Sequence, residues 1–542
     1  YFFMDRIGER FQSIDGHKGQ IRYFGKVLSS KNPETLWYGV EWDDPSRGTH
    51  SGEVLDEEGK CVRYFSCENG RGSFIRPQKV QFGRSLLEAI REKYAPPDRD
   101  AEELSLAVKN KTKEFFQPVI FVGQDQVYAK QSKLDEIRTV SCLSSRISHF
   151  GLEAELSKYC AAIEEIDLED NLFYEWKTIS QMCSQLQLID LRLNKNCISS
   201  LVDCSLFEHS LSQLRLLMIS CVPNAWENAL SLSVHGCLPN LEELYLCENS
   251  MTKFSVSNPS DLSNAFLNLK VLDLTSNVFS EWSIIEDIGC FPSLEKLVLN
   301  QNKISSIPIP KTNVGDSDEK DGNSLFPNLN TLWLKNNPIS DLSSFDALNL
   351  FPRLANLRFT QNPLADKLGP AILRQLVIAK MEKLTIANKS EIGKRERSDS
   401  ERFFIRQCVA EHNEDSSKSI ESMHPRYADL VALHGQTFTT VKSTGKGSSL
   451  MDNIAELTIR SMDPDSITTP AKTKKIPLSM TVSNVKMICK RLFKLHPSKQ
   501  RLFFRDRLEF PMPLDDDLKS LSYFGVRSGG EILMENSDLS SS

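Results

Sequence analysis

A short pattern of spaced leucines recurs through the middle of this 542-residue chain and constrains its fold more than any other feature. Its form is Leu-x-x-Leu-x-Leu-x-x-Asn-x-Leu, and most copies start about 25 to 28 residues apart, a period typical of stacked repeats. A repeat of this length predicts a solenoid in which each copy packs against its neighbours. The copies begin at Leu188, Leu241, Leu269, Leu294, Leu329 and Leu354, with a looser copy at Ile163 and one without the asparagine at Leu214.

The leucines and the asparagine of each copy have separate expected roles. The Leu-x-Leu core predicts a short strand whose alternate side chains point into the solenoid. The repeated asparagine is expected to satisfy backbone groups where each strand turns, so that stacked copies form a ladder. One copy is overlong, and its extra residues form the polar run 311–324, which predicts a surface loop.

The side chain between the two leucines of each core should point out of the concave face of the repeats. In two copies this residue is a large aromatic, Tyr245 or Trp333, and in the last copy it is Arg358. Large aromatics on a solvent-facing sheet are typical of protein interfaces. We therefore predict a concave interaction surface that includes Tyr245, Trp333 and Arg358. The alternative is that these side chains pack under a neighbouring loop, such as 311–324.

Composition and charge exclude several classes of protein. The net charge of −7 gives no reason to expect a nucleic-acid partner. No apolar run approaches the roughly 18 residues of a membrane span. The 13 cysteines include no C-x-x-C pair, which favours reduced thiols in a cytosolic setting. We also find no H-E-x-x-H, G-x-S-x-G, Walker loop or zinc spacing, so the sequence predicts neither an enzyme nor a bound cofactor or metal.

The first 84 residues have a different sequence pattern, with short β-type runs separated by glycines and with many aromatic side chains. Five segments in this order resemble a CAP-Gly domain: Gly19–Gly25, Trp37–Asp43, Gly48–Gly52, Arg63–Phe65 and Gly72–Pro77. The resemblance implies a small all-β barrel that binds acidic carboxyl-terminal tails ending in an aromatic residue, such as that of α-tubulin. The positions that it implies for the groove and its loop are Trp37, Gly48, Thr49, His50, Gly52, Phe74 and Arg76.

The signature loop departs from the family pattern at two positions. The family loop usually reads Gly-Lys-(Asn/His)-Asp-Gly, whereas this chain has Thr49 and Ser51 in place of the lysine and the aspartate. Loss of a lysine beside an anionic tail is expected to weaken the electrostatic part of binding. The alternative is that the module is a scaffold with attenuated affinity for tails.

The segments that flank the repeats predict caps and linkers. Residues 85–93 have apolar side chains at helical spacing, and residues 115–128 predict strands that cap the first repeat. Residues 371–384 predict an amphipathic closing helix, which residues 402–433 continue. Residues 435–449 predict a flexible linker.

The last module alternates strand, strand, helix and strand, and ends in an apolar strand at 531–534. The helix is expected over 483–495, with Thr481 or Ser483 as its N-cap. This order resembles the β-grasp of ubiquitin-like domains, most closely at Gln500–Phe504, Leu518 and Tyr523. The chain does not end in Gly-Gly, so we expect a docking module that is not conjugated to other proteins.

The predicted fold class is therefore multidomain: an all-β CAP-Gly barrel, an α/β leucine-rich-repeat solenoid and an α+β ubiquitin-like β-grasp. We expect the CAP-Gly domain at 1–84, a connector and N-terminal cap at 85–130, and the repeats with their C-terminal cap at 131–400. A helical segment and linker then occupy 401–450, the ubiquitin-like domain 451–537, and a tail 538–542.

These three modules in this order resemble the tubulin-folding cofactor E family over nearly the whole chain. The resemblance implies a cytoplasmic, cytoskeleton-associated and non-enzymatic factor that binds α-tubulin and promotes assembly, and in reverse dissociation, of the α/β-tubulin heterodimer. It also implies work with tubulin cofactors D and C and regulation by an Arf-like small GTPase. A contact between the ubiquitin-like domain and the proteasome is a further possible interaction. The alternative function is a microtubule-associated adaptor that binds acidic tubulin tails through CAP-Gly and recruits partners through its repeats; a ubiquitin-pathway enzyme is a weaker third.

Overall fold

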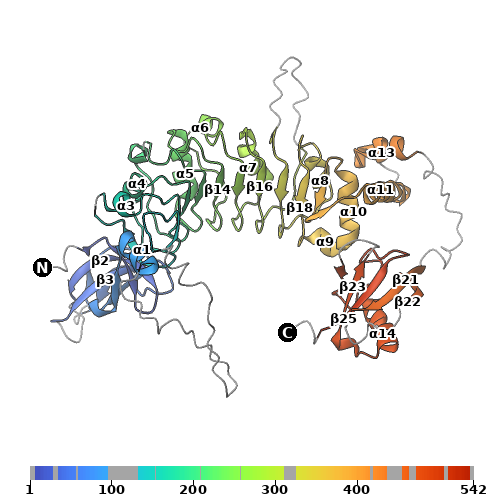
Figure 1. The fold of residues 1–542 in the computed structure, drawn as a ribbon, viewed down its shortest axis with the longest axis horizontal. Helices are drawn as coiled ribbons and strands as arrows, with labels where there is room; N and C mark the ends of the chain where they lie inside the picture. Colours follow the sequence, from blue (N-terminus) through green and yellow to red (C-terminus); the bar gives the residue numbers. More distant parts are fainter. Residues whose placement is uncertain are drawn as a thin grey trace, which may run out of the picture. The chain divides into compact units, whose positions relative to one another are not determined.

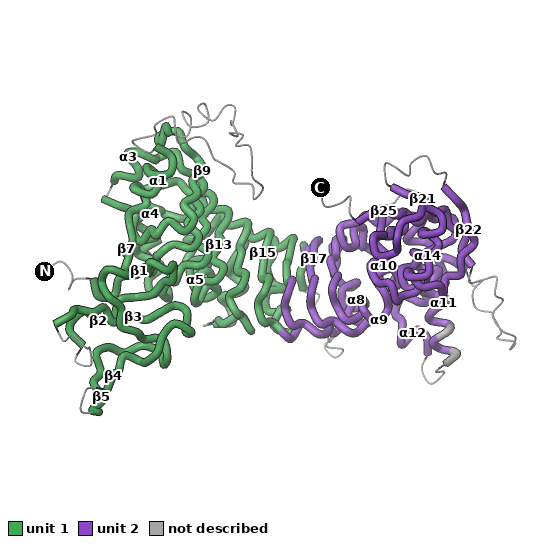
Figure 2. Tube along the Cα trace, turned by 90° about the horizontal axis from the view of Figure 1, so that it is seen from below, with its two compact units in different colours: residues 1–279, 283–299, 325–328 green, residues 280–282, 300–324, 329–542 purple. Residues whose placement is uncertain are grey.

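The computed structural model describes most of the chain as two compact units (Figure 2). The first unit comprises residues 1–279, 283–299 and 325–328, and the second comprises residues 280–282, 300–324 and 329–542. The predicted strands at 115–128, the predicted loop at 311–324 and the predicted linker after residue 435 lie outside the described residues. The described residues are 6–27, 34–55, 59–95, 132–152, 154–207, 209–256, 258–309, 325–414, 419–435, 454–462, 471–505 and 511–537.

The first unit begins with a small all-β module, as the glycine-rich sequence predicts. Five antiparallel strands pair in the order β6-β3-β2-β1-β7, and a separate hairpin joins β4 to β5. The sheet closes over a core of Phe11, Ile21, Tyr38, Val40 and Trp42. The elements are β1 (Arg10–Ser13), β2 (Lys18–Lys26), β3 (Leu36–Trp42), β4 (Glu53–Leu55), β5 (Cys61–Arg63), β6 (Gly72–Ile75), η2 (Pro77–Lys79) and β7 (Val80–Phe82).

The repeats of the first unit form a parallel sheet with one short strand from each copy, and α4, α5 and α6 lie on one side of that sheet (Figure 1). The register places the central leucine of each strand opposite the next, from Leu191 through Leu217 and Leu244 to Leu272. The strands are β9 (Thr139–Ser141), β11 (Glu165–Asp167), β12 (Asp190–Arg192), β13 (Leu216–Met218), β14 (Glu243–Tyr245), β15 (Val271–Asp273) and β16 (Lys296–Val298). The helical segments are α3 (Glu155–Tyr159), α4 (Trp176–Cys183), η3 (Cys204–Phe207), α5 (Ala225–Val234), α6 (Pro259–Asn264), α7 (Trp282–Glu286) and η4 (Asp287–Cys290).

The asparagine ladder predicted from the pattern is confirmed. The Asn277 side chain accepts hydrogen bonds from the N–H groups of Asn249 and Met251, at 3.1 and 3.0 Å. It donates to the carbonyl oxygens of Leu246 and Leu274, at 2.9 and 3.0 Å. The amide therefore joins two successive copies and leaves few buried backbone groups unsatisfied.

Strand β8 (Arg84–Ser85) and helix α1 (Leu86–Tyr94) cover the start of the repeats. β8 pairs in parallel with β10 (Ile147–His149). Ser85 caps the helix, and it forms a reciprocal capping box with Glu88. The Tyr94 hydroxyl accepts a hydrogen bond from the Ser141 N–H at 2.9 Å. The helix predicted at 85–93 is thus confirmed.

The second unit continues the repeats and closes them with helices. The closing helix predicted at 371–384 is α10, which ends earlier, at Lys380, because the chain then turns to bury Leu384 and enter β19. The continuation predicted at 402–433 is confirmed, since α11 and α13 pack on α10 around Leu376, Ile405 and Leu430. The elements are β17 (Thr331–Trp333), α8 (Ser343–Leu348), β18 (Asn356–Arg358), α9 (Pro363–Leu368), α10 (Pro370–Lys380), β19 (Ile386–Ala387), β20 (Ser390–Glu391), α11 (Lys394–Glu414), α12 (Ile420–Met423) and α13 (Tyr427–His434).

The carboxyl-terminal module is the predicted β-grasp. Its strands pair in the order β22-β21-β25-β23-β24, with β21 and β25 parallel. The helix packs on a core that includes Leu457, Val485 and Ile532, and Thr481 is its N-cap. The elements are β21 (Ile454–Ser461), β22 (Lys472–Pro477), α14 (Val482–Phe493), η7 (Pro497–Lys499), β23 (Gln500–Arg505), β24 (Met512–Pro513) and β25 (Glu531–Asn536).

Candidate functional site

The loop at residues 48–52 folds back onto the first residue of β6. The Gly72 N–H donates to the His50 carbonyl oxygen at 2.7 Å, and the N–H groups of Thr49 and His50 both donate to the Gly72 carbonyl oxygen. The Gly52 N–H donates to Nδ1 of His50 at 3.0 Å. These hydrogen bonds hold the shape of the loop, so the N–H groups of Thr49, His50 and Gly52 are already used within the protein.

The two glycines of this loop are required by close backbone contacts. A Cβ on Gly48 would lie 2.0 Å from the carbonyl oxygen of Gly70. Gly52 has φ +92°, and a Cβ there would lie 2.0 Å from the carbonyl oxygen of Phe65. Glycine is the residue that tolerates both a positive φ and such an approach. The sequence prediction that Gly48 and Gly52 shape the loop therefore has a steric basis.

Phe74, on β6, lies at the centre of an aromatic cluster. Its ring centroid is 5.2 Å from His50, 5.3 Å from Tyr64 and 5.6 Å from Phe65. Tyr23 lies 6.2 Å from Phe74, nearly at right angles to it. Edge-to-face rings at these separations attract one another and present a rigid apolar surface. The cluster can receive an aromatic side chain of a partner.

Trp37 and Arg76 form a second group beside this cluster, because β3 pairs with β6 at Tyr38 and Ile75. The Arg76 guanidinium carbon lies 5.7 Å from the Trp37 ring centroid. The Trp37 indole N–H is buried, and no hydrogen-bond partner exists for it within the described ranges. The Arg76 guanidinium is a hydrogen-bond donor that suits a carboxylate. Six of the seven predicted residues therefore lie on β3, on β6 or in the loop that folds on β6, and Arg76 directly follows β6.

Three aromatic residues of the cluster, Tyr23, Tyr64 and Phe65, are absent from the sequence-predicted site. The aromatic density of the first module was visible in the sequence, but the family motif singles out only Trp37 and Phe74. Burial raises the pKa of Tyr23, and the neighbouring Tyr64 raises it further. The Tyr23 hydroxyl donates to the Lys26 carbonyl oxygen at 2.8 Å, so Tyr23 contributes its ring to the cluster.

The predicted repeat-surface residues fall in both units. In the first unit, the Tyr245 hydroxyl donates to a Glu243 carboxylate oxygen at 2.6 Å, and burial together with Glu243 raises the pKa of Tyr245. In the second unit, Trp333 and Arg358 occupy paired positions of β17 and β18. The Arg358 guanidinium carbon lies 3.6 Å from the Trp333 ring centroid, a cation–π stack. Both side chains are half-buried, so part of the stack faces solvent.

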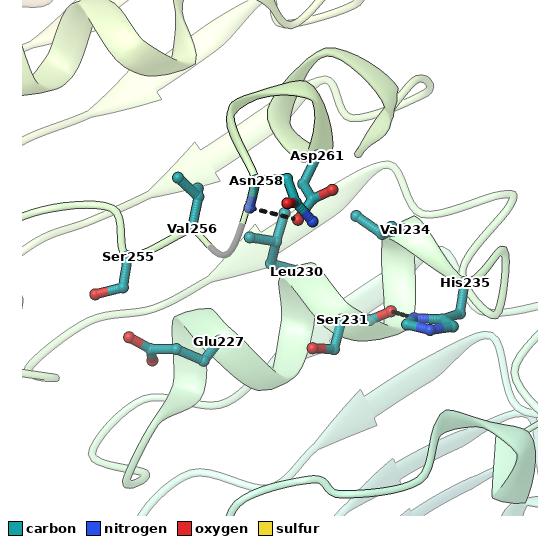
Figure 3. Close-up of a pocket in the computed structure, with 9 residues that line it drawn as sticks. All are labelled: Glu227, Leu230, Ser231, Val234, His235, Ser255, Val256, Asn258 and Asp261. Atoms are coloured by element: carbon teal, nitrogen blue, oxygen red, sulfur yellow. Dashed lines mark hydrogen bonds between the residues drawn. The ribbon is translucent and has the colours of Figure 1, made fainter.

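A pocket of about 460 Å³ lies between α5 and the segment that leads into α6 (Figure 3). Its lining includes the carboxylates of Glu227 and Asp261 and the imidazole of His235. Asp261 accepts a hydrogen bond from the Asn258 N–H, and His235 Nδ1 bonds to the Ser231 carbonyl oxygen. These polar groups cap and close helices, and they do not form a paired acid and base.

Neither a metal cluster nor a membrane helix is found in the described part of the chain. No group of three or more His, Cys, Asp or Glu side chains is placed there to hold a metal ion. No helix within the same ranges is long and apolar enough to cross a membrane.

Comparison with known proteins finds matching families in two parts of the chain. The CAP-Gly domain family matches residues 7–80, and a leucine-rich-repeat family matches residues 292–347. The solved ubiquitin-like domain of mouse tubulin-specific chaperone E is 26% identical, with a TM-score of 0.15, and the match covers 17% of this chain and 93% of that chain.

Two relatives match along nearly their full length. Tubulin-folding cofactor E of Arabidopsis thaliana is 32% identical over 98% of this chain and 97% of its own. Human tubulin-specific chaperone E is 31% identical over 98% of both chains. Agreement of this extent spans all three modules in the same order. The chain therefore belongs to the tubulin-folding cofactor E family, also called tubulin-specific chaperone E.

Proposed function

We propose that this protein is a tubulin-folding cofactor that binds α-tubulin and promotes assembly of the α/β-tubulin heterodimer. Its membership of the family over nearly the whole chain is the observation that carries the proposal. The same binding, run in reverse, dissociates dimers, because a protein that binds one free subunit lowers the net stability of the dimer. Binding and release of a subunit need no covalent step, so we propose no catalytic residue.

In this proposal, the groove of the first module binds the acidic tail of α-tubulin. The aromatic cluster around Phe74 receives the terminal ring of the tail, and Arg76 receives a carboxylate. Gly48, Thr49, His50 and Gly52 hold the loop that closes one side of the groove. Thr49 and Ser51 bring no charge to this contact, so we expect the tail alone to bind weakly.

The folded body of α-tubulin binds the repeats, with Tyr245, Trp333 and Arg358 as contacts. Large aromatic and arginine side chains supply most of the binding energy in many interfaces. A tail held in the groove raises the effective concentration of the tubulin body near the repeats. Weak tail binding is therefore compatible with firm capture of the whole subunit.

Further partners extend this proposal. Tubulin cofactors D and C would receive or deliver the subunits, and an Arf-like small GTPase would regulate the assembly. The ubiquitin-like module would dock on the proteasome or on another member of this machinery. All of these partners place the protein in the cytoplasm, associated with the cytoskeleton.

The test separates tail binding from body binding with two variants of the full chain. Phe74→Ala should abolish binding of an α-tubulin tail peptide and leave the binding of tubulin without tails unchanged. Trp333→Ala should weaken the binding of tubulin without tails and leave the binding of the tail peptide unchanged. Tyr159→Ala, which removes an exposed aromatic side chain on helix α3, is the matched control. Isothermal titration would measure both affinities. Equal loss of both activities in either variant would contradict the division of labour, and co-sedimentation with microtubules without binding of soluble tubulin would favour the adaptor.

A further inference from the structure

The connection between the CAP-Gly barrel and the repeats is very short. Strand β7 pairs with β1 of the barrel and ends at Phe82. Strand β8 starts at Arg84 and pairs with β10 of the repeats, so Gly83 alone lies between two paired strands. A Cβ on Gly83 would lie 2.1 Å from the Ser148 hydroxyl oxygen, which shows how closely the chain passes there. A single residue between two paired strands is too short to act as a flexible linker between the barrel and the repeats.

A lysine of the barrel forms a second connection, remote in sequence. Lys18 is the first residue of β2. Its ammonium donates to the Asp170 carboxylate at 2.7 Å and to the Asn171 carbonyl oxygen at 3.3 Å. It also donates to the Asp170 carbonyl oxygen. An ammonium has three protons, and all three thus have acceptors on the repeats. The Lys18 side chain is 12% exposed, so solvent screens this contact only partly.

The acceptors of Lys18 are themselves held by the repeats. Asp170 has a left-handed backbone with φ +61°, and its second carboxylate oxygen accepts from the Ser144 hydroxyl at 2.6 Å. The side chain of Asn171 is fully buried in the asparagine ladder and bonds to the Ile147 N–H at 2.9 Å and the Cys142 carbonyl oxygen at 2.8 Å. The anchor point is therefore part of the rigid first repeats.

The barrel side of the contact is equally fixed. The Asp43 N–H donates to the Lys18 carbonyl oxygen at 3.1 Å, and the Asp43 carboxylate forms a two-pronged ion pair with the buried Arg10. The Arg10 side chain is 4% exposed and that of Asp43 is 35% exposed, so removing the Asp43 carboxylate would leave a buried guanidinium unpaired.

We propose that Lys18 and Asp170 are positioning residues that fix the tail groove relative to the repeat surface around Tyr245. The barrel and Tyr245 belong to the same compact unit. A partner with a tail and a folded body then meets two sites at a set separation, and the second contact forms without reorienting the barrel. This inference rests on the proposed function, and it adds that the two sites act as one receptor because of this contact.

The test compares tail peptide with intact α-tubulin on the full chain. Lys18→Met removes the ammonium, and Asp170→Asn removes the charge but tolerates the left-handed backbone. Lys26→Met, at the other end of β2, removes an exposed lysine that pairs with Glu34 and serves as the matched control. The distance between a label on the barrel and one on the repeats is measured by double electron–electron resonance.

We expect Lys18→Met and Asp170→Asn to broaden the distance distribution and to weaken binding of intact α-tubulin by about tenfold, as for a coupling of ordinary size. The affinity for the tail peptide should stay within about twofold of the parent value. Lys26→Met should change neither quantity. Unchanged binding of intact α-tubulin despite a broadened distribution would overturn the proposal, as would an unbroadened distribution. If the parent chain bound neither ligand, the proposed function itself would fail, which is a different result.

Discussion

The substitution Gly52→Ala tests the steric account of the groove loop, and Gly16→Ala is its matched control. The two glycines have nearly the same φ, +92° for Gly52 and +90° for Gly16. Around Gly16 nothing lies within 4 Å of an added Cβ, whereas around Gly52 that atom would lie 2.0 Å from the Phe65 carbonyl oxygen. The control therefore reports the dihedral effect alone, which destabilises by about 1 kcal/mol. Gly52→Ala adds a backbone collision, for which we expect about 2 kcal/mol more.

Hydrogen exchange of the β6 amides, read by mass spectrometry, measures this difference on the full chain. An additional 2 kcal/mol corresponds to about 30-fold faster exchange through opening of the module. Because the Phe65 ring packs against Phe74, we also expect Gly52→Ala to weaken tail-peptide binding at least tenfold, while Gly16→Ala leaves it unchanged. Equal exchange rates and equal peptide affinities in the two variants would refute the steric account.

Three further substitutions or conditions probe other parts of the structure. Burial lowers the pKa of His50, whose Nδ1 accepts from the Gly52 N–H, so the stability from this neutral imidazole is complete above about pH 6.5 and is lost as the pH falls through the lowered pKa. Tail binding should weaken over the same fall in pH, and His50→Asn should show a flatter pH profile in a peptide titration. Lys380→Met should lower the free energy of unfolding in urea by about 3–5 kcal/mol, because it leaves the buried Asp346 carboxylate unpaired, and adding Asp346→Leu should recover most of the loss. Equal free energies of unfolding for the single and double variants would contradict this explanation. Asn277→Leu should lower the free energy of unfolding by about 3 kcal/mol, because four hydrogen bonds of the ladder are lost. A loss below about 0.5 kcal/mol in urea unfolding, the level of an ordinary surface substitution, would contradict the ladder's role.

The repeats could be predicted from sequence in detail because the same leucines define the motif and fill the core. Once Leu332 and Leu357 point inward, Trp333 and Arg358 must occupy equivalent outward positions on successive strands, so their stacking follows from the register. The β-grasp was predictable for a similar reason, since the apolar spacing changes from the period of strands to that of helices and back. The end of α10 could not be predicted, because Leu384 fits the helical spacing although it is buried in the turn after the helix.

Contacts between distant segments left no trace in the sequence. Lys18 and Asp170 are 152 residues apart, and neither position belongs to a periodic pattern that would link them. The use of the Thr49 and His50 N–H groups was also not visible, because it depends on the approach of β6 at Gly72. Such pairings come from tertiary packing, which local propensity and periodicity do not encode.

The most direct measurement is a titration of the full chain with tubulin heterodimer, with and without the α-tubulin tail, followed by size-exclusion chromatography and native mass spectrometry. Our account predicts a complex that contains this protein and α-tubulin but no β-tubulin, and a weaker complex of the same composition when the tail is removed. A complex that disappears entirely without the tail, or one that always retains β-tubulin, would contradict it.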